Sequence, residues 1–247
     1  MCVQVTSWNH HEVGTHLTKC HLVEEVICIS ARRTMNPDHP VAKLLWAHFY
    51  KTLPLNVLAR KVLLPGQFRL LAAQGLEHTA CIVNNFFYNF NVPANYVDTD
   101  LKVPHQPARV AQARGFLDDN GEVNLETYRY GTLALAYWKA ILSFVTKVLN
   151  AVYATDDAVQ KDVNLAKWSE EVRVRGSLRS FPAAFSTIVD ISRCVTFIIF
   201  NASVQHSAVN YLQRYYMAFV PNAPGSLYND LPDESVRLNS ASTAAMV

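Results

Sequence analysis

The chain has 247 residues, of which 50% are hydrophobic and 17% are charged, with only 8 glycines. This composition excludes a disordered or linker-like chain and predicts one large folded domain or part of one. The chain carries 22 Lys and Arg residues against 20 Asp and Glu residues, a formal charge of +2. Neither sign is concentrated in one stretch, so the charge predicts no nucleic-acid partner.

The cysteine pattern and the chain start bear on the cellular compartment. The five cysteines are scattered without a CxxC pair, which is typical of free thiols in a reducing compartment. Residues 1–11 lack a charged segment followed by an apolar one, so we expect no export signal. No uninterrupted apolar run approaches the roughly 20 residues of a bilayer span, so we expect no transmembrane segment. The predicted localisation is cytoplasmic.

Turn-forming residues divide the chain into long segments with helical periodicity. Residues 13–33 predict one helix, and residues 41–63 predict one or two. We expect Pro54 to interrupt the second segment, because proline lacks an amide donor and clashes with the preceding turn. Residues 125–154 predict a long buried helix, and Thr155 is a candidate N-cap for the helix that follows.

The rest of the chain is either strongly apolar or irregular. Residues 185–219 are apolar nearly all round, which predicts at least one helix at the centre of the domain. Residues 91–121 and the tail at 225–247 show little periodicity, and we expect the tail to be loosely ordered. Strand signals are scarce. The predicted fold class is all-α.

The histidines are the first candidates for chemistry. Four of the nine lie within residues 10–21, and His206 lies far along the chain. On an ideal α-helix His16 and His21 point roughly 140° apart, which argues against a shared metal ion. A π-type turn places them on one face, and such turns occur mostly at functional sites. His206 and Asn210 are four residues apart and share a face, so two such helices predict a four-ligand site.

The spacing alone leaves a purely structural role open. HxxxxH is a weak pattern, and buried histidines usually make ordinary hydrogen bonds. In that alternative His16 and His21 are surface or capping residues, and His206 is a hydrogen-bonded core residue.

Several motifs together favour the metal site. HLTKCHLVE at residues 16–24 resembles the first metal-binding helix of lipoxygenases. HPVAKLL at residues 39–45 and LNVLAR at residues 55–60 resemble the family's HP-x-x-KLL-x-PH and IN-x-x-AR signatures. QHSAVN at residues 205–210 resembles the second metal helix, and PNAP at residues 221–224 resembles the run that follows it. Order and spacing agree over roughly residues 8–224. We therefore expect residues 1–224 to form part of a lipoxygenase-like catalytic domain.

The resemblance implies a non-haem iron enzyme that inserts O2 into polyunsaturated fatty acids and forms hydroperoxides. By position, it implies that His16, His21 and His206 are the imidazole ligands of one iron ion. It also implies that Asn210 is a weaker fourth ligand, since imidazole is the better donor to iron. The expected partners are the fatty acid and O2.

Four further residues match substrate-related positions of the family. Leu17 and Leu55 match the positions that clamp the reacting carbon, although both are also plausible core leucines. Ala59 matches the position that is alanine in most S-specific members and glycine in most R-specific ones. Gln213 resembles an amide that links a metal ligand to the substrate channel.

The sequence departs from the family pattern in several places. Ala47 replaces the proline of the KLL-x-PH signature, Leu55 replaces an isoleucine, and a glycine-rich run is reduced to Gly75. The family's N-terminal β-barrel and much of its C-terminal part have no match here, so we expect a truncated domain core. Apolar surface exposed in such a core favours self-association.

The last iron ligand of the family is the carboxylate of a terminal isoleucine. Val247 could supply that carboxylate only if residues 225–247 return to the core, and we expect it to lie away from the metal. Three hypotheses follow: an active minimal lipoxygenase, a partial form with an incomplete metal site, and a fatty-acid-binding or interaction protein without catalysis.

Overall fold

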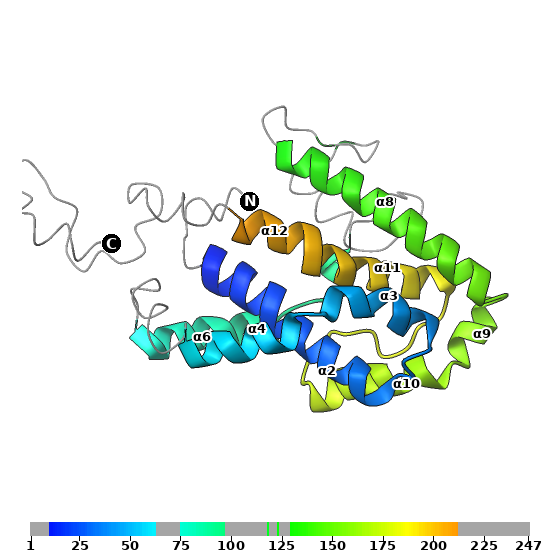
Figure 1. The fold of residues 1–247 in the computed structure, drawn as a ribbon, viewed down its shortest axis with the longest axis horizontal. Helices are drawn as coiled ribbons and strands as arrows, with labels where there is room; N and C mark the ends of the chain where they lie inside the picture. Colours follow the sequence, from blue (N-terminus) through cyan, green and yellow to red (C-terminus); the bar gives the residue numbers. More distant parts are fainter. Residues whose placement is uncertain (1–9, 63–74, 97–117, 119–122, 124–128, 212–247) are drawn as a thin grey trace, which may run out of the picture.

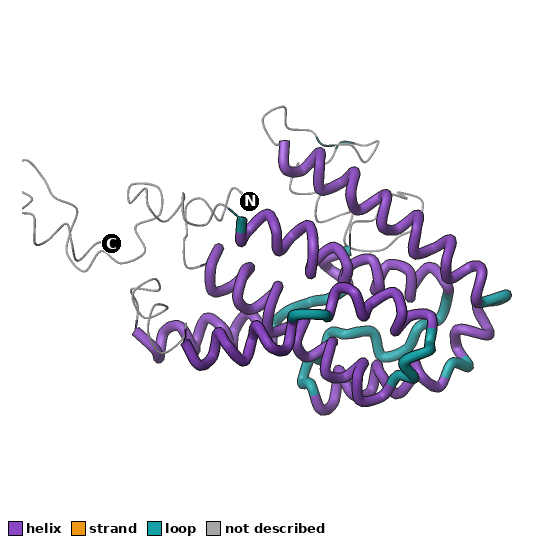
Figure 2. The backbone as a smooth tube through the Cα atoms, in the orientation of Figure 1, coloured by secondary structure: helices purple, strands orange, loops and turns teal. Residues whose placement is uncertain are grey.

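The computed structural model describes residues 10–62, 75–96, 118, 123 and 129–211. The regular elements in this part of the chain are all helices (Figures 1 and 2), which confirms the all-α prediction. Most of the predicted irregular stretch at 91–121 and all of the predicted loose tail at 225–247 lie outside the described residues. The described start of the first stretch, residues 91–96, contains only a single 3₁₀ turn.

The first helix is continuous but changes from a π-helix to an α-helix along its length. The π-helix η1, His10–Val23, passes directly into the α-helix α2, Glu24–Thr34, because Val23 itself has helical dihedrals (φ −64°, ψ −45°). The predicted helix over residues 13–33 is therefore confirmed. The predicted π-type turn is also confirmed, and it extends over all 14 residues of η1.

Two helices follow, and the break between them differs from the prediction. Helix α3, Pro40–Phe49, begins at His39, whose ring nitrogen accepts a hydrogen bond from the amide of Val41. Helix α4 spans Thr52–Leu58, so Pro54 lies inside it. The expected interruption at Pro54 was wrong, because a proline in the first turn of a helix removes an amide that has no intrahelical partner there.

Helix α6, Gly75–Tyr88, packs closely along η1 (Figure 1). A Cβ atom at Gly14 would lie 2.6 Å from the ring of Phe86, so with any larger residue here the Phe86 ring would have to shift. A short 3₁₀ helix, η3 (Pro93–Asn95), follows.

The second half of the chain begins with the long helix α8, Arg129–Val152, which confirms a helix within residues 125–154. The expectation that this helix is buried was wrong, because only one narrow face, with Leu135, Trp138, Val145 and Leu149, packs into the core. Thr155 caps helix α9, Asp156–Gln160, by accepting from the amide of Ala158, as predicted. Helix α10, Val163–Glu170, continues into a short π-helix, η4, Glu171–Arg175.

The central rod of the fold is formed by three consecutive helical segments. These are α11, Ile188–Phe200, the π-helix η5, Asn201–Gln205, and α12, His206–Asn210. Every residue from Ile191 to Phe200 is buried, and the rod packs against α8 and α3. This confirms the prediction of a central helix within residues 185–219. A reciprocal capping box between Thr187 and Asp190 fixes where the rod begins.

Aromatic packing fills the core around this rod. Trp138 of α8 meets Phe200 of α11 edge to face at 5.4 Å, and Trp168 of α10 meets Phe181 at 5.0 Å. The largest fully buried side chains include Trp138, Trp168, Phe49, Phe181, Phe197 and Ile27. The four cysteines of the described residues are free thiols.

Two helices in the described residues are long and apolar enough to cross a membrane by length and composition alone. In the segment Ile188–Asn210, 61% of the most apolar window is buried inside the protein, as expected for a core helix. In Arg129–Val152 the buried share is 22%. Polar residues interrupt both helices, so neither contains the long uninterrupted apolar run on which the sequence prediction depended. The absence of a membrane span therefore stays a prediction.

Candidate metal centre

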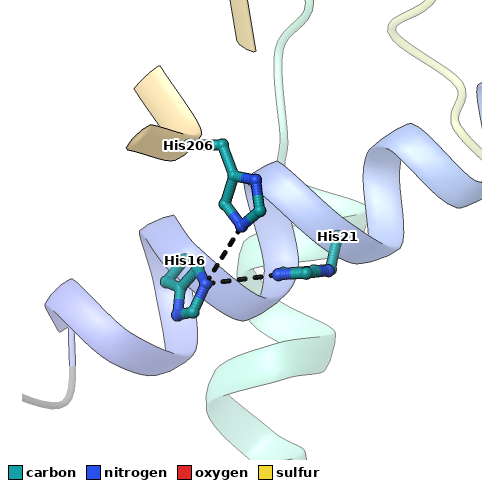
Figure 3. Close-up of side chains that lie close together, drawn as sticks. All are labelled: His16, His21 and His206. Carbon is teal, nitrogen blue, oxygen red and sulfur yellow. Dashed lines mark hydrogen bonds between the residues drawn. The ribbon is translucent and has the colours of Figure 1, made fainter. Parts of the chain in front are cut away.

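The winding of η1 brings two histidines together on one face. In a π-helix the backbone bonds join residues five apart, so His16 and His21 lie one above the other. Their Nε2 atoms are 3.2 Å apart (Figure 3). The expected divergence of roughly 140° on an α-helix is thereby removed.

The third histidine comes from the central rod. His206, at the start of α12, points toward η1, and its Nε2 atom lies 3.3 Å from that of His16 (Figure 3). The ligand atoms of the three histidines all lie within 4.8 Å of one another. The structure thus brings together the three imidazoles that the sequence predicted as ligands.

A buried amide holds the two histidine-bearing helices side by side. Asn201, fully buried on η5, donates from Nδ2 to the carbonyl of Lys19 at 3.0 Å and to Glu24 Oε1 at 2.7 Å. Its Oδ1 accepts from the thiol of Cys20 at 3.5 Å. Asn201 is not among the site residues predicted from the sequence. The signal that points to it is a polar residue directly after a ten-residue buried segment.

The surroundings of His206 and His21 favour the neutral form of imidazole that metals bind. Burial, reinforced by the neighbouring His21 and His16, lowers the pKa of His206 to about 4. Burial also lowers the pKa of His21, and His16 adds to that effect. A neutral imidazole has a free lone pair, so these rings are ready to coordinate a cation near neutral pH.

The spacing of the three nitrogens fits a first-row metal ion. With metal–nitrogen bonds of about 2.1 Å, as for zinc, two ligands at right angles are about 3.0 Å apart, and at the tetrahedral angle about 3.4 Å apart. The observed separations of 3.2 and 3.3 Å fall between these values. Imidazole suits iron, manganese and zinc to different degrees, so the donor set by itself does not select the metal.

Two polar side chains contact the opposite edges of the η1 histidines. Glu12 Oε1 lies 2.9 Å from His16 Nδ1, and Asn56 Oδ1 of α4 lies 2.8 Å from His21 Nδ1. Neither Glu12 nor Asn56 is among the site residues predicted from the sequence. The i,i+4 relation of Glu12 to His16 was a usable signal, whereas the Asn56 contact depends on how α4 crosses the first helix.

The other predicted site residues occupy different positions. Asn210 is half-buried at the last position of α12, one helical turn after His206. Leu17 packs with Ile82 and Val83 of α6 around the buried Val13. Leu55 is 45% exposed on α4, and Ala59 is half-buried just after it. Gln213 and Val247 lie outside the described residues.

The described residues thus form a helical domain with a candidate metal site of three converging histidines, one pair of which comes from a π-helix. The lipoxygenase family model matches residues 1–243 of this chain. The chain therefore belongs to the lipoxygenase family.

Curated relatives agree with this assignment. The chain is 36% identical over 242 residues to a manganese lipoxygenase of Pleurotus sapidus, covering 96% of this chain and 36% of that protein. It is 32% identical to the linoleate 9/13-lipoxygenase of Pseudomonas aeruginosa, covering 89% of this chain and 30% of that protein. The chain thus spans about a third of the length of these relatives.

Solved structures show the same fold. The fungal lipoxygenase of Fusarium graminearum superimposes with a TM-score of 0.78 at 31% identity, over 94% of this chain and 34% of that one. A coral 8R-lipoxygenase superimposes with a TM-score of 0.81 at 27% identity, over 99% of this chain and 37% of that one.

Proposed function

We propose that this chain carries the metal centre of a dioxygenase that inserts O2 into polyunsaturated fatty acids to give hydroperoxides. The observation that carries the proposal is the convergence of one ring nitrogen from each of His16, His21 and His206 within 4.8 Å. Membership of the lipoxygenase family supplies the reaction class.

We propose iron as the metal, held by His16, His21 and His206 with Asn210 as a weaker ligand. When bound, the metal would supply the one-electron oxidation of a doubly allylic methylene of the fatty acid. The chain's own residues hold the metal, orient the fatty acid and exclude water. Manganese is the alternative metal, because the relative from Pleurotus sapidus is named a manganese lipoxygenase.

Metal analysis tests the centre directly. The purified full chain should retain one equivalent of iron or manganese, and His206→Ala should lose it, because the substitution removes one of three imidazoles. His48→Ala is the matched control, since His48 is a half-buried histidine on α3 that is not among the converging rings. Equal metal content in His206→Ala and the parent contradicts the assignment.

Substrate turnover tests the reaction. Linoleate and arachidonate are suitable probes, because conjugated-diene absorbance and O2 uptake both report dioxygenation. We propose that Leu17 and Leu55 contact the chain of the fatty acid near the reacting carbon, and that Gln213 links the metal site to that channel.

The second candidate is a lipoxygenase-like protein that binds a fatty acid or a partner without catalysis. Exposed Leu55, Val57 and Leu58 on α4 favour it, because exposed apolar side chains provide a surface that a lipid or a partner can cover. Metal retention without diene formation or O2 uptake, together with saturable fatty-acid binding, would identify this alternative.

We do not expect residues 225–247 to contribute a metal ligand. We propose that the carboxylate of Val247 is not a metal ligand, because residues 225–247 offer few apolar anchors to offset their conformational entropy. Removing Val247 alone should leave the metal content unchanged, and a loss of metal on its removal refutes this.

We also propose, from the sequence, that the protein is cytoplasmic and that it self-associates. Exposed Leu133, Tyr137 and Phe144 on α8 provide apolar surface for self-association. Sedimentation analysis of the purified chain tests it.

A further inference from the structure

In His16 and His21, only the Nε2 atom of each ring faces the other histidines, so the contacts of the two Nδ1 atoms need a separate explanation. On the opposite edge, the Nδ1 atom of His16 faces the carboxylate of Glu12, and that of His21 faces the amide oxygen of Asn56. Both contacts are shorter than 3.0 Å, and both partners are buried, with Glu12 7% and Asn56 3% exposed. Both contacts are therefore hydrogen bonds, because burying a polar atom is costly unless it is hydrogen-bonded.

The orientation of the Asn56 amide is fixed by its other partners. Its Nδ2 group donates to the carbonyl of His21 at 3.1 Å and to Glu25 Oε2 at 3.0 Å. Both of these atoms can only accept, so the oxygen of the amide must face His21 Nδ1. Glu25 is held in turn by Arg60, whose Nη1 donates to Oε1 at 2.8 Å. Asn56 therefore has no freedom to reverse its amide.

These acceptors determine which nitrogen of each ring carries the proton. Carboxylate and amide oxygens accept hydrogen bonds, so each Nδ1 is the donor in its contact. In a neutral ring the Nε2 atom then has its lone pair free and aimed at the other two histidines. Fixing one ring nitrogen by a hydrogen bond to its neighbour is how proteins orient histidine ligands.

We propose that Glu12 and Asn56 are positioning residues of the metal centre, which hold His16 and His21 in the Nδ1–H tautomer and so aim both Nε2 atoms at the cation. This inference rests on the proposed metal-dependent function. The two residues are not equivalent. Glu12 brings a negative charge to within one imidazole ring of the cation, whereas Asn56 brings a neutral dipole.

The charge difference has a measurable consequence. A carboxylate behind an imidazole makes the ring a stronger donor, and its negative charge offsets part of the charge of the cation. Glu12→Gln keeps an oxygen that can accept from Nδ1 but removes the charge. Glu12→Ala removes both, so its effect on metal affinity should be the larger one.

The experiment uses the full chain, stripped of metal and titrated with Mn²⁺ while free Mn²⁺ is followed by its electron paramagnetic resonance signal. Glu12→Ala and Asn56→Leu should each weaken Mn²⁺ binding by about 10–100-fold, and Glu12→Gln by less than Glu12→Ala. Glu170→Gln is the matched control, because it removes a carboxylate from an exposed position and should bind like the parent.

A second measurement separates positioning from a merely structural role. Long-range proton–nitrogen correlation spectra of the metal-free chain distinguish the two imidazole tautomers. His16 should be in the Nδ1–H form in the parent and in Glu12→Gln, and it should shift toward the Nε2–H form in Glu12→Ala. Far-UV circular dichroism identifies the variants that fold like the parent, and Glu12→Gln keeps the test available if Glu12→Ala does not fold.

The outcomes are distinguishable. If the parent binds Mn²⁺ and the folded variants bind it equally well with unchanged tautomers, the positioning role is refuted and the proposed function stands. If the parent itself binds no Mn²⁺ and contains no other metal, the proposed function fails and the inference fails with it.

Discussion

Glu24 makes the stability of this protein depend on pH in an unusual direction. Its side chain is 1% exposed at the start of α2, and burial raises its pKa from 4.5 to about 8, although the hydrogen bond from Asn201 and the charge of Lys19 oppose the rise. Its Oε1 accepts from Asn201, and its Oε2 has no hydrogen-bond partner among the described residues. Glu24 should therefore be protonated in the folded protein at pH 7.

The magnitude follows from the difference between the folded and unfolded states. At about 1.36 kcal/mol per pKa unit, a rise from 4.5 to about 8 corresponds to about 5 kcal/mol. Between these two pH values the folded state binds more protons than the unfolded state, so the free energy of unfolding falls as the pH rises. The loss begins near pH 4.5 and is complete above about pH 8. A loss of this size is comparable to the whole stability of many domains.

Glu24→Gln isolates this effect, because glutamine has nearly the same shape and no charge in this range. Urea unfolding followed by circular dichroism at pH 5, 6.5 and 8.5 should show that the variant gains stability relative to the parent as the pH rises. Glu170→Gln removes an exposed carboxylate and should follow the parent at every pH. Parallel pH profiles for Glu24→Gln and the parent would refute the argument that Glu24 is buried in its neutral form.

Three other substitutions probe packing, a buried hydrogen bond and the substrate site. Gly176→Ala places a Cβ atom 2.3 Å from a methyl group of Val26 and 2.6 Å from the carbonyl oxygen of Val172, so urea unfolding should show a loss of about 1–3 kcal/mol, and parental stability argues against this close approach. Tyr153→Phe removes the 2.6 Å hydrogen bond to Asp162 and should cost about 1–3 kcal/mol at pH 7. Burial raises the pKa of Asp162, but the hydrogen bonds from Tyr153 and His39 outweigh burial and lower that pKa below 3.8. As the pH falls below 3.8 the carboxylate becomes protonated, so the difference in unfolding free energy between Tyr153→Phe and the parent should shrink. Ala59→Gly, conditional on turnover, should raise the R-configured fraction of the product in chiral chromatography, and an unchanged product removes Ala59 from the substrate site.

The sequence by itself determined the helical class, the main helices and the three histidines. Apolar periodicity identifies helices such as α8 and α11. A helix of a folded protein buries at least one face, so its apolar residues recur at the spacing of helical turns. It also predicted widened winding around His16 and His21, since residues five apart cannot share a face of an α-helix. The family motifs then singled out His206 from the other histidines of the chain.

Only the tertiary structure decided what surrounds those histidines. Asn201, Asn56 and Glu24 act across helices that are far apart in the sequence, and the orientation of one helix against another depends on packing that no local pattern encodes. The break before α4 shows the same limit at short range. Pro54 disfavours a helix only where an amide donor is needed, and whether it is needed depends on where the helix begins, at Thr52.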